Sequence, residues 1–242
     1  MFKINPLVYI FIIIMFFTGS FKEFIIIYSL IIIHECGHIL FSYLFKLKIK
    51  HIYLYPLGGI SVVESNLNIN PIKELIILIM GPLFQQVAYL LLSALFPYYI
   101  KVIKVYHSGI LLFNLLPIYP LDGGKIVNVL LQKIFPYKIS YKIVIILSYF
   151  ITFIIFFISN KTYINNYIFL IVILIIITKE KNKIYYLYNK FLLERYLNNY
   201  NFKKTNIIKN ENNFFRNRKH ILNINNKYEL EKDYLRRKFK YF

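Results

Sequence analysis

Three side chains that can bind a metal ion or activate water stand together in an apolar stretch of the chain. His34, Glu35 and His38 lie in the segment IIIHECGHIL, residues 31–40. Residues four positions apart share one face of an α-helix, so both imidazoles can reach one ion, and Glu35 can act beside it as a general base. The alternative is a group of hydrogen-bonded core residues. An ionisable group at the centre of a bilayer costs at least about 2.5–3.5 kcal/mol, which favours the metal site.

A third ligand must come from another part of the chain, because a catalytic zinc ion usually has three protein ligands and one open position. The candidate is Asp122, in the segment NLLPIYPLDGGK at residues 114–125. Two prolines and two glycines around it would unwind a helix end and let the carboxylate turn inward. An isolated Asp-Gly pair is more typical of a turn or a helix cap. Together with two histidines in a chain that has few charges, the ligand interpretation is favoured.

Two further histidines, His51 and His107, lie near the ends of predicted apolar segments. We interpret them as interfacial residues and not as ligands, since imidazole has an apolar body and a polar tip.

The surroundings of the motif indicate a membrane protein. Of the 242 residues 58% are hydrophobic, whereas globular chains are roughly 45–50% apolar. Buried strands are the alternative, because Ile and Phe also favour strands. We predict an all-α membrane protein, a polytopic bundle of about six transmembrane helices, since a span needs roughly 20 apolar residues. The predicted spans are 4–21, 24–45, 72–99, 105–121, 143–159 and 163–178.

The parts between and after these segments differ in character. Residues 46–71 alternate apolar and polar residues before a PLGG break, which predicts a small β-hairpin or a re-entrant element. Residues 179–242 hold 17 of the 30 Lys and Arg, with a net charge of +11. We predict a transmembrane core over residues 1–178, followed by a basic tail over 179–242 that is partly helical or disordered.

The distribution of lysines predicts the orientation of the bundle. Lys and Arg are enriched in cytoplasmic loops, and here they gather on alternate loops and in the tail. This pattern predicts a multi-pass protein of the cell membrane with its N-terminus and its tail in the cytoplasm. The formal charge of +19 could also indicate nucleic acid, but no recognition motif accompanies it. We therefore expect a lipid bilayer as the partner of the basic residues, and no nucleic acid.

The two polar segments, together with LYPLGGISVVE and GPLFQ between them, resemble the site-2 protease family of intramembrane zinc metalloproteases, and within it a sporulation branch. The resemblance covers about residues 24–130. It implies Zn²⁺ held by His34, His38 and Asp122, with Glu35 activating water. It further implies that Asn114 holds the substrate or stabilises the oxyanion, although Asn114 could equally be a hydrogen-bonded helix residue.

The same resemblance implies a substrate and partners. The substrate would be a membrane-associated proprotein, such as a sigma factor precursor processed during sporulation, and inhibitory membrane proteins would restrain the enzyme. Many members of the branch carry a C-terminal nucleotide-sensing CBS domain, but the last 64 residues here are too few and too polar to form one. A different class of function stays open, in which the polar cluster belongs to a non-catalytic membrane metal-ion transporter or scaffold.

Overall fold

The computed structural model describes residues 2–4, 6–47, 49–55, 58–63, 67–158, 164–198, 200, 202, 204–224 and 227–240. The chain forms two compact units, and each is described by itself. The first contains Met1–Asn66 and Ile72–Leu115, and the second contains Leu67–Pro71 and Leu116–Phe242. The sequence predicted a division after residue 178, where the chain changes from apolar to polar. That division differs from the boundary between the two compact units, and it stays a prediction about function.

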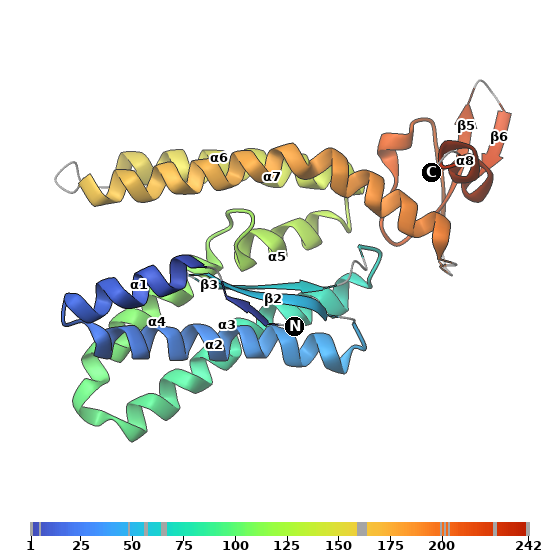
Figure 1. Ribbon diagram of the computed structural model, residues 1–242. Helices are drawn as coiled ribbons and strands as arrows, with labels where there is room; N and C mark the ends of the chain where they lie inside the picture. Colours follow the sequence, from blue (N-terminus) through green and yellow to red (C-terminus); the bar gives the residue numbers. More distant parts are fainter. Residues whose placement is uncertain are drawn as a thin grey trace. The chain divides into compact units, whose positions relative to one another are not determined.

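Helices and one small sheet make up the first unit (Figure 1). The helices are α1 Pro6–Phe17, α2 Phe21–Leu44, α3 Pro71–Leu95 and α4 Ile100–Leu115, with a short 3-10 helix, η1 Pro97–Tyr99, before α4. Helices suit these apolar sequences because a helix satisfies its own backbone hydrogen bonds where water is scarce. The long α2 carries the histidine motif, and α3 contains a proline, Pro82, in its interior.

The loop predicted as a hairpin does form one. Strands β2 Ile49–Tyr55 and β3 Gly58–Val63 pair antiparallel, with Ile52 opposite Ser61. A third strand, β1 Phe2–Ile4, lies parallel to β2 on its other side, so the strand order is β1-β2-β3. The sheet therefore has β3 at one edge.

Three helices in the described part of the chain are long and apolar enough to cross a membrane: α2, α3 and α6 Tyr137–Ile158. They match three of the six predicted spans. Helices α1 and α4, with 12 and 16 residues, occupy two more of the predicted segments, but they fall short of the roughly 20 residues that a span requires. The multi-pass helical architecture is confirmed, and the number of six spans stays a prediction.

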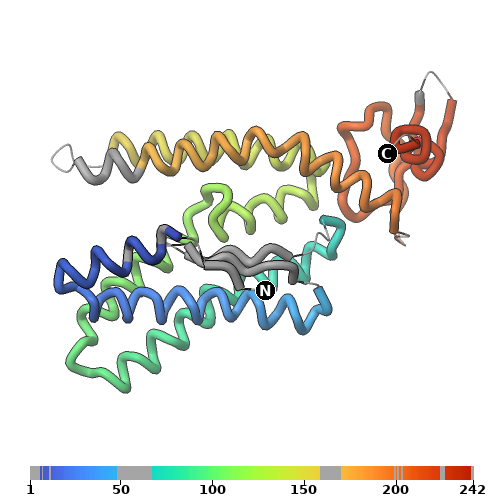
Figure 2. Tube along the Cα trace, in the orientation of Figure 1, coloured from blue at the N-terminus to red at the C-terminus, as the bar shows by residue number. Residues whose placement is uncertain are grey.

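The second unit contains two long helices and a small C-terminal module. Helix α5 Asp122–Leu131 precedes α6, which packs against α7 Ile164–Leu197 (Figure 2). Strand β4 Thr205–Ile208 lies parallel to β5 Lys219–Ile224, and β5 pairs antiparallel with β6 Lys227–Leu230. A 3-10 helix, η2 Glu211–Asn213, and the final helix α8 Glu231–Lys238 complete the module.

The sequence predicted a tail that is partly helical or disordered, and its described residues form helices and a small sheet. Its apolar residues are sparse along the chain, but they gather in one core with residues of α6 and α7. The buried members of this core are Tyr137, Tyr188, Phe191, Leu192, Ile208, Phe214, Leu222 and Leu235. This core could not be predicted from local sequence, because the C-terminal segment is polar on the whole and the apolar members come from segments far apart in the chain.

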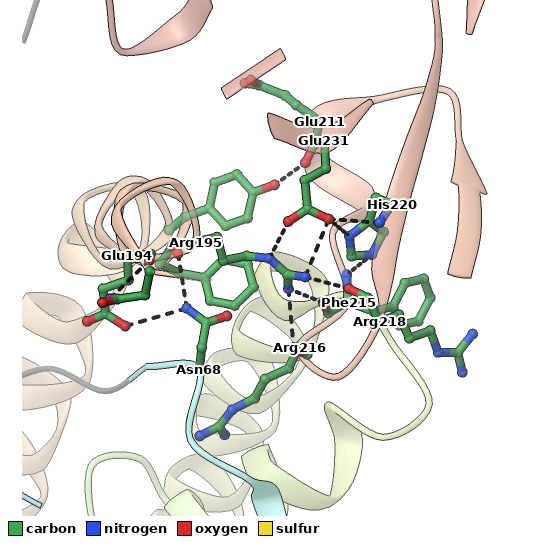
Figure 3. Close-up of polar contacts among 12 residues, drawn as sticks. Asn68, Glu194, Arg195, Glu211, Phe215, Arg216, Arg218, His220 and Glu231 are labelled. Atoms are coloured by element: carbon green, nitrogen blue, oxygen red, sulfur yellow. Dashed lines mark hydrogen bonds and ion pairs between the residues drawn. The ribbon is translucent and has the colours of Figure 1, made fainter. Parts of the chain in front are cut away.

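Buried charges in the module are paired, as burial requires. Arg195 of α7 donates from Nε to Glu231 Oε1 at 2.6 Å, and the backbone N–H of His220 donates to Glu231 Oε2 at 2.7 Å (Figure 3). The neighbouring Glu194 accepts a 2.8 Å hydrogen bond from the backbone of Leu67. Helix α7 thereby holds both the C-terminal strands and the short segment that precedes α3.

Candidate metal centre

The two histidines of the motif face each other on α2. Both are buried, and their Nε2 atoms lie 3.1 Å apart. Two ligand nitrogens of a tetrahedral zinc ion, each about 2.0–2.1 Å from the metal, lie roughly 3.3 Å apart. The i, i+4 spacing therefore produces the separation that one ion requires.

Contacts with α3 hold the opposite side of each ring. His38 Nδ1 lies 2.8 Å from the backbone oxygen of Ile77, and His34 Nδ1 lies 3.1 Å from Oε1 of Gln85. A carbonyl oxygen only accepts, so Nδ1 of His38 carries the hydrogen and Nε2 keeps its lone pair. This is the usual arrangement of a metal-binding histidine, whose second nitrogen donates to a fixed acceptor.

A glycine on α3 lies close to the two ligand nitrogens, where no side chain would fit. A Cβ atom at Gly81 would come closer than 3 Å to Nε2 of both His34 and His38. At the same helix crossing, a Cβ atom at Gly37 would lie 2.5 Å from the backbone oxygen of Met80. The two glycines let α2 and α3 approach closely and leave room for the imidazole rings.

The part that α3 plays was not predicted from the sequence. Ile77, Gly81 and Gln85 are spaced four residues apart, so they lie on one face of α3, and all three contact the histidine pair. The signal that could have identified this face is a glycine and a buried amide at helical spacing in an otherwise apolar segment. His107, which was expected near the end of a span, is buried in the middle of α4.

The structure places the other two predicted residues of the first unit on the expected helices. Glu35 follows His34 on α2 and is half-buried. Asn114 is half-buried in the last turn of α4. Their roles as general base and substrate-binding group stay predictions.

Asp122 begins α5 in the second unit. Helix α4 ends at Leu115, and a turn with a cis peptide bond between Tyr119 and Pro120 leads to α5, which agrees with the predicted unwinding. Asp122 is buried, and Lys125 Nζ lies 3.4 Å from its Oδ1. The positive end of the helix dipole favours a carboxylate at this position.

The set of donors suits zinc. His34, His38 and Asp122 are each buried, and each offers one atom that can bind a metal ion. Two imidazole nitrogens and one carboxylate make a typical catalytic ligand set, which leaves the fourth position for water or substrate.

Comparison with known proteins agrees with this chemistry. The model of peptidase family M50 matches residues 22–107 and 97–158, more than half of the chain. Stage IV sporulation protein FB of Bacillus subtilis (strain 168) is 29% identical over 208 residues, which is 80% of this chain and 70% of that protein. Zinc metalloprotease MJ0392 of Methanocaldococcus jannaschii is 33% identical over 129 residues, 50% of this chain and 37% of that protein.

A solved structure shows the same fold. The site-2 protease from Methanocaldococcus jannaschii superposes with a TM-score of 0.58, at 22% identity, over 75% of this chain and 89% of that chain. The family match also favours a peptidase over a transporter or a scaffold. The chain belongs to peptidase family M50 and is a multi-pass intramembrane zinc metalloprotease of the site-2 protease type.

Proposed function

We propose that this protease holds its zinc ion with His34, His38 and Asp122 and uses Glu35 as the general base. The observation that carries the proposal is the 3.1 Å separation of the two Nε2 atoms, at a point where only glycine fits on the facing helix. Zinc in such a site lowers the pKa of bound water toward about 7 and polarises the scissile carbonyl.

Glu35 and Asn114 supply the proton transfer and the substrate hydrogen bond. Glu35 accepts the proton of the attacking water and delivers it to the leaving amine, so that the new carboxyl group and the new amino group both form. Asn114 donates a side-chain hydrogen bond to the substrate backbone or to the oxyanion. Each of these groups acts in the transition state, so its loss is expected to reduce kcat more than it changes KM.

The substrate must present an extended strand, because the peptide bonds of a helix are occupied by its own hydrogen bonds. Strand β3 lies at an edge of its sheet. An unwound substrate segment can add to that edge through backbone hydrogen bonds, as in other β-augmentation complexes. Strands β2 and β3 follow α2 in the chain, and β3 contacts α2, the helix that carries the histidine motif.

The substrate class is a membrane-associated proprotein, and a sigma factor precursor is the specific candidate. The support is the similarity to a protein named for stage IV of sporulation. In this proposal the enzyme lies in the bacterial cell membrane, its C-terminal module faces the cytoplasm, and membrane proteins that inhibit it are its partners.

Co-expression with a membrane-associated sigma factor precursor tests the proposal. The parent protein should release the shortened product, whereas Glu35→Gln and Asp122→Asn should reduce release by at least about 100-fold, within the usual range for general-base catalysis. Glu23→Gln, the same change near the start of α2, is the matched control and should cleave like the parent. Purified Glu35→Gln should retain zinc, because Glu35 is not a ligand. Release by Glu35→Gln at the parent rate would remove the assignment.

A further inference from the structure

Gln85 connects the histidine motif to α4. This side chain is completely buried on α3. Its Oε1 lies 3.1 Å from Nδ1 of His34, and its Nε2 lies 3.0 Å from the backbone oxygen of His107. One amide therefore spans the distance between a motif histidine on α2 and the backbone of α4.

The backbone contact determines which way the amide of Gln85 points. A backbone oxygen can only accept a hydrogen bond, so the NH₂ group of Gln85 must face His107. Turning the amide round would place two oxygens in contact in a buried site, which costs about 1–3 kcal/mol. Oε1 consequently faces His34.

The orientation of the amide in turn determines the tautomer of His34. Because Oε1 only accepts, Nδ1 of His34 must carry the hydrogen, and Nε2 keeps its lone pair as an acceptor or ligand. Nε2 is the atom that faces His38 across 3.1 Å. The hydrogen bond between Gln85 and the backbone of α4 therefore determines that Nε2 of His34, the proposed metal-binding nitrogen, carries no hydrogen.

The anchor itself is held in place by its neighbours. The ring of His107 stacks on Tyr89, with 4.4 Å between ring centroids. Its Nε2 lies 3.1 Å from Oε1 of Gln86, which can only accept. His107 is therefore the Nε2–H tautomer, and its Nδ1, 3.5 Å from Nε2 of Gln85, is free to accept a second, long hydrogen bond.

We propose that Gln85 is a positioning residue of the metal site, which sets the tautomer and the ring orientation of His34. The proposal rests on the proposed role of His34 as a ligand. Without an oxygen beside Nδ1, the ring of His34 can rotate. It can also become the Nε2–H tautomer, in which a hydrogen blocks the nitrogen that would bind the metal. Loss of such a partner typically weakens metal affinity by about 10–100-fold.

Zinc affinity, measured on the detergent-solubilised full chain by competition with a chromophoric chelator, tests this role. All variants carry Glu35→Gln, so that the readout is independent of catalysis. Gln85→Met keeps the length of the side chain and removes both hydrogen bonds, and it should bind zinc about 10–100-fold more weakly. Gln85→Glu, with its carboxyl group protonated, can still donate to the His107 oxygen and accept from His34, so it should restore affinity to within a few-fold of the parent. Because the anchor is a backbone oxygen and a phenyl ring can keep the stack on Tyr89, His107→Phe should bind zinc within a few-fold of the parent.

A spectrum separates positioning from a general loss of structure. The visible absorption of the Co²⁺-loaded protein reports the ligand geometry, so it should change in Gln85→Met and recover in Gln85→Glu. Parent-like zinc affinity in Gln85→Met, while His34→Ala loses zinc, would overturn the role of Gln85 alone. Parent-like affinity in His34→Ala would overturn the ligand assignment, and the inference with it. A loss in Gln85→Met that Gln85→Glu does not restore would assign Gln85 to packing and would also overturn the proposal.

Discussion

The guanidinium of Arg216 donates a 2.9 Å hydrogen bond from Nη1 to Oε1 of Gln132, and both side chains are buried. Gln132 directly follows α5, the helix that begins with Asp122. A second connection lies nearby, where the backbone N–H of Tyr137 donates to the oxygen of Phe214 at 2.9 Å. The C-terminal module therefore belongs to the same compact unit as the proposed carboxylate ligand and holds the far end of its helix.

Removal of the Arg216 side-chain donor should loosen α5. In Arg216→Met the buried oxygen of Gln132 loses its partner, at a cost of about 1–3 kcal/mol. We expect faster hydrogen–deuterium exchange in the amides of α5, measured by mass spectrometry on the full chain. Arg236→Met, at an exposed arginine of α8, is the matched control and should leave this exchange unchanged. Equal exchange in both variants would show that the contact does not stabilise the helix.

Gly81→Ala should damage the metal site directly. The added methyl group would lie closer than 3 Å to Nε2 of His34 and of His38, so both rings must move. We expect zinc affinity and cleavage to fall at least about tenfold, since ligand geometry tolerates only small shifts. Gly109→Ala adds the same group to α4, where nothing lies within 4 Å, and should be neutral. Full zinc binding by Gly81→Ala would show that the rings do not converge beside this glycine.

Gly124→Ala tests the turn that presents Asp122. A Cβ atom at Gly124 would collide with the backbone of Ile118 and Tyr119, which cannot move as a flexible side chain can. The start of α5 should shift, and cleavage should fall about tenfold or more, because misplacement of a reacting group by about 1 Å can cost 100-fold. Metal analysis of the purified variant should show reduced zinc content. Parent-like cleavage would mean that the turn can adjust without displacing the carboxylate.

Acidification should loosen the C-terminal module through His220. This ring is completely buried, and its Nε2 accepts a 2.9 Å hydrogen bond from the backbone N–H of Phe215. Protonation would place two donors against each other, and burial lowers the pKa of His220 even though the hydrogen bond to Glu231 opposes this effect. Burial alone would raise the pKa of Glu231, but the hydrogen bond with His220 and the charge of Arg195 bring the pKa below its usual value.

The direction of the pH effect follows from these two lowered pKa values. Each group takes up protons more readily in the unfolded chain, so the stability it contributes is complete above its unfolded pKa and is lost as the pH falls. For His220 the loss begins below about pH 6.5, by up to about 1.4 kcal/mol per pH unit. For Glu231 the loss begins below about pH 4.3.

Amides of β5 should therefore exchange faster at pH 5.5 than at pH 7.5, after correction for intrinsic rates. His220→Gln removes the titrating group and should flatten this difference, and a parent protein without any difference would contradict the mechanism.

The chemistry of the site could be predicted wherever it depends on local pattern. Two histidines at i and i+4 share a face of any helix, and prolines with glycines around Asp122 end one helix and begin another. The hairpin at 46–71 was also predictable, because alternation and a Gly-containing break are local signals. The number of spans could not be predicted in the same way, because apolar composition does not show where a helix ends.

Residues 1–242 by themselves determined the reactive groups, the helical class and the membrane character, because these depend on residue type and on spacing along one element. Only the tertiary structure decided that Gln85 and Ile77 hold the two imidazoles and that Gly81 leaves room for them. It also gathered scattered apolar residues of the C-terminal segment, among them Phe214, Leu222 and Leu235, into a core with α6 and α7. The physical reason is the same in each case: hydrogen-bond partners and core neighbours are chosen in space, between elements whose separation in sequence carries no periodic signal.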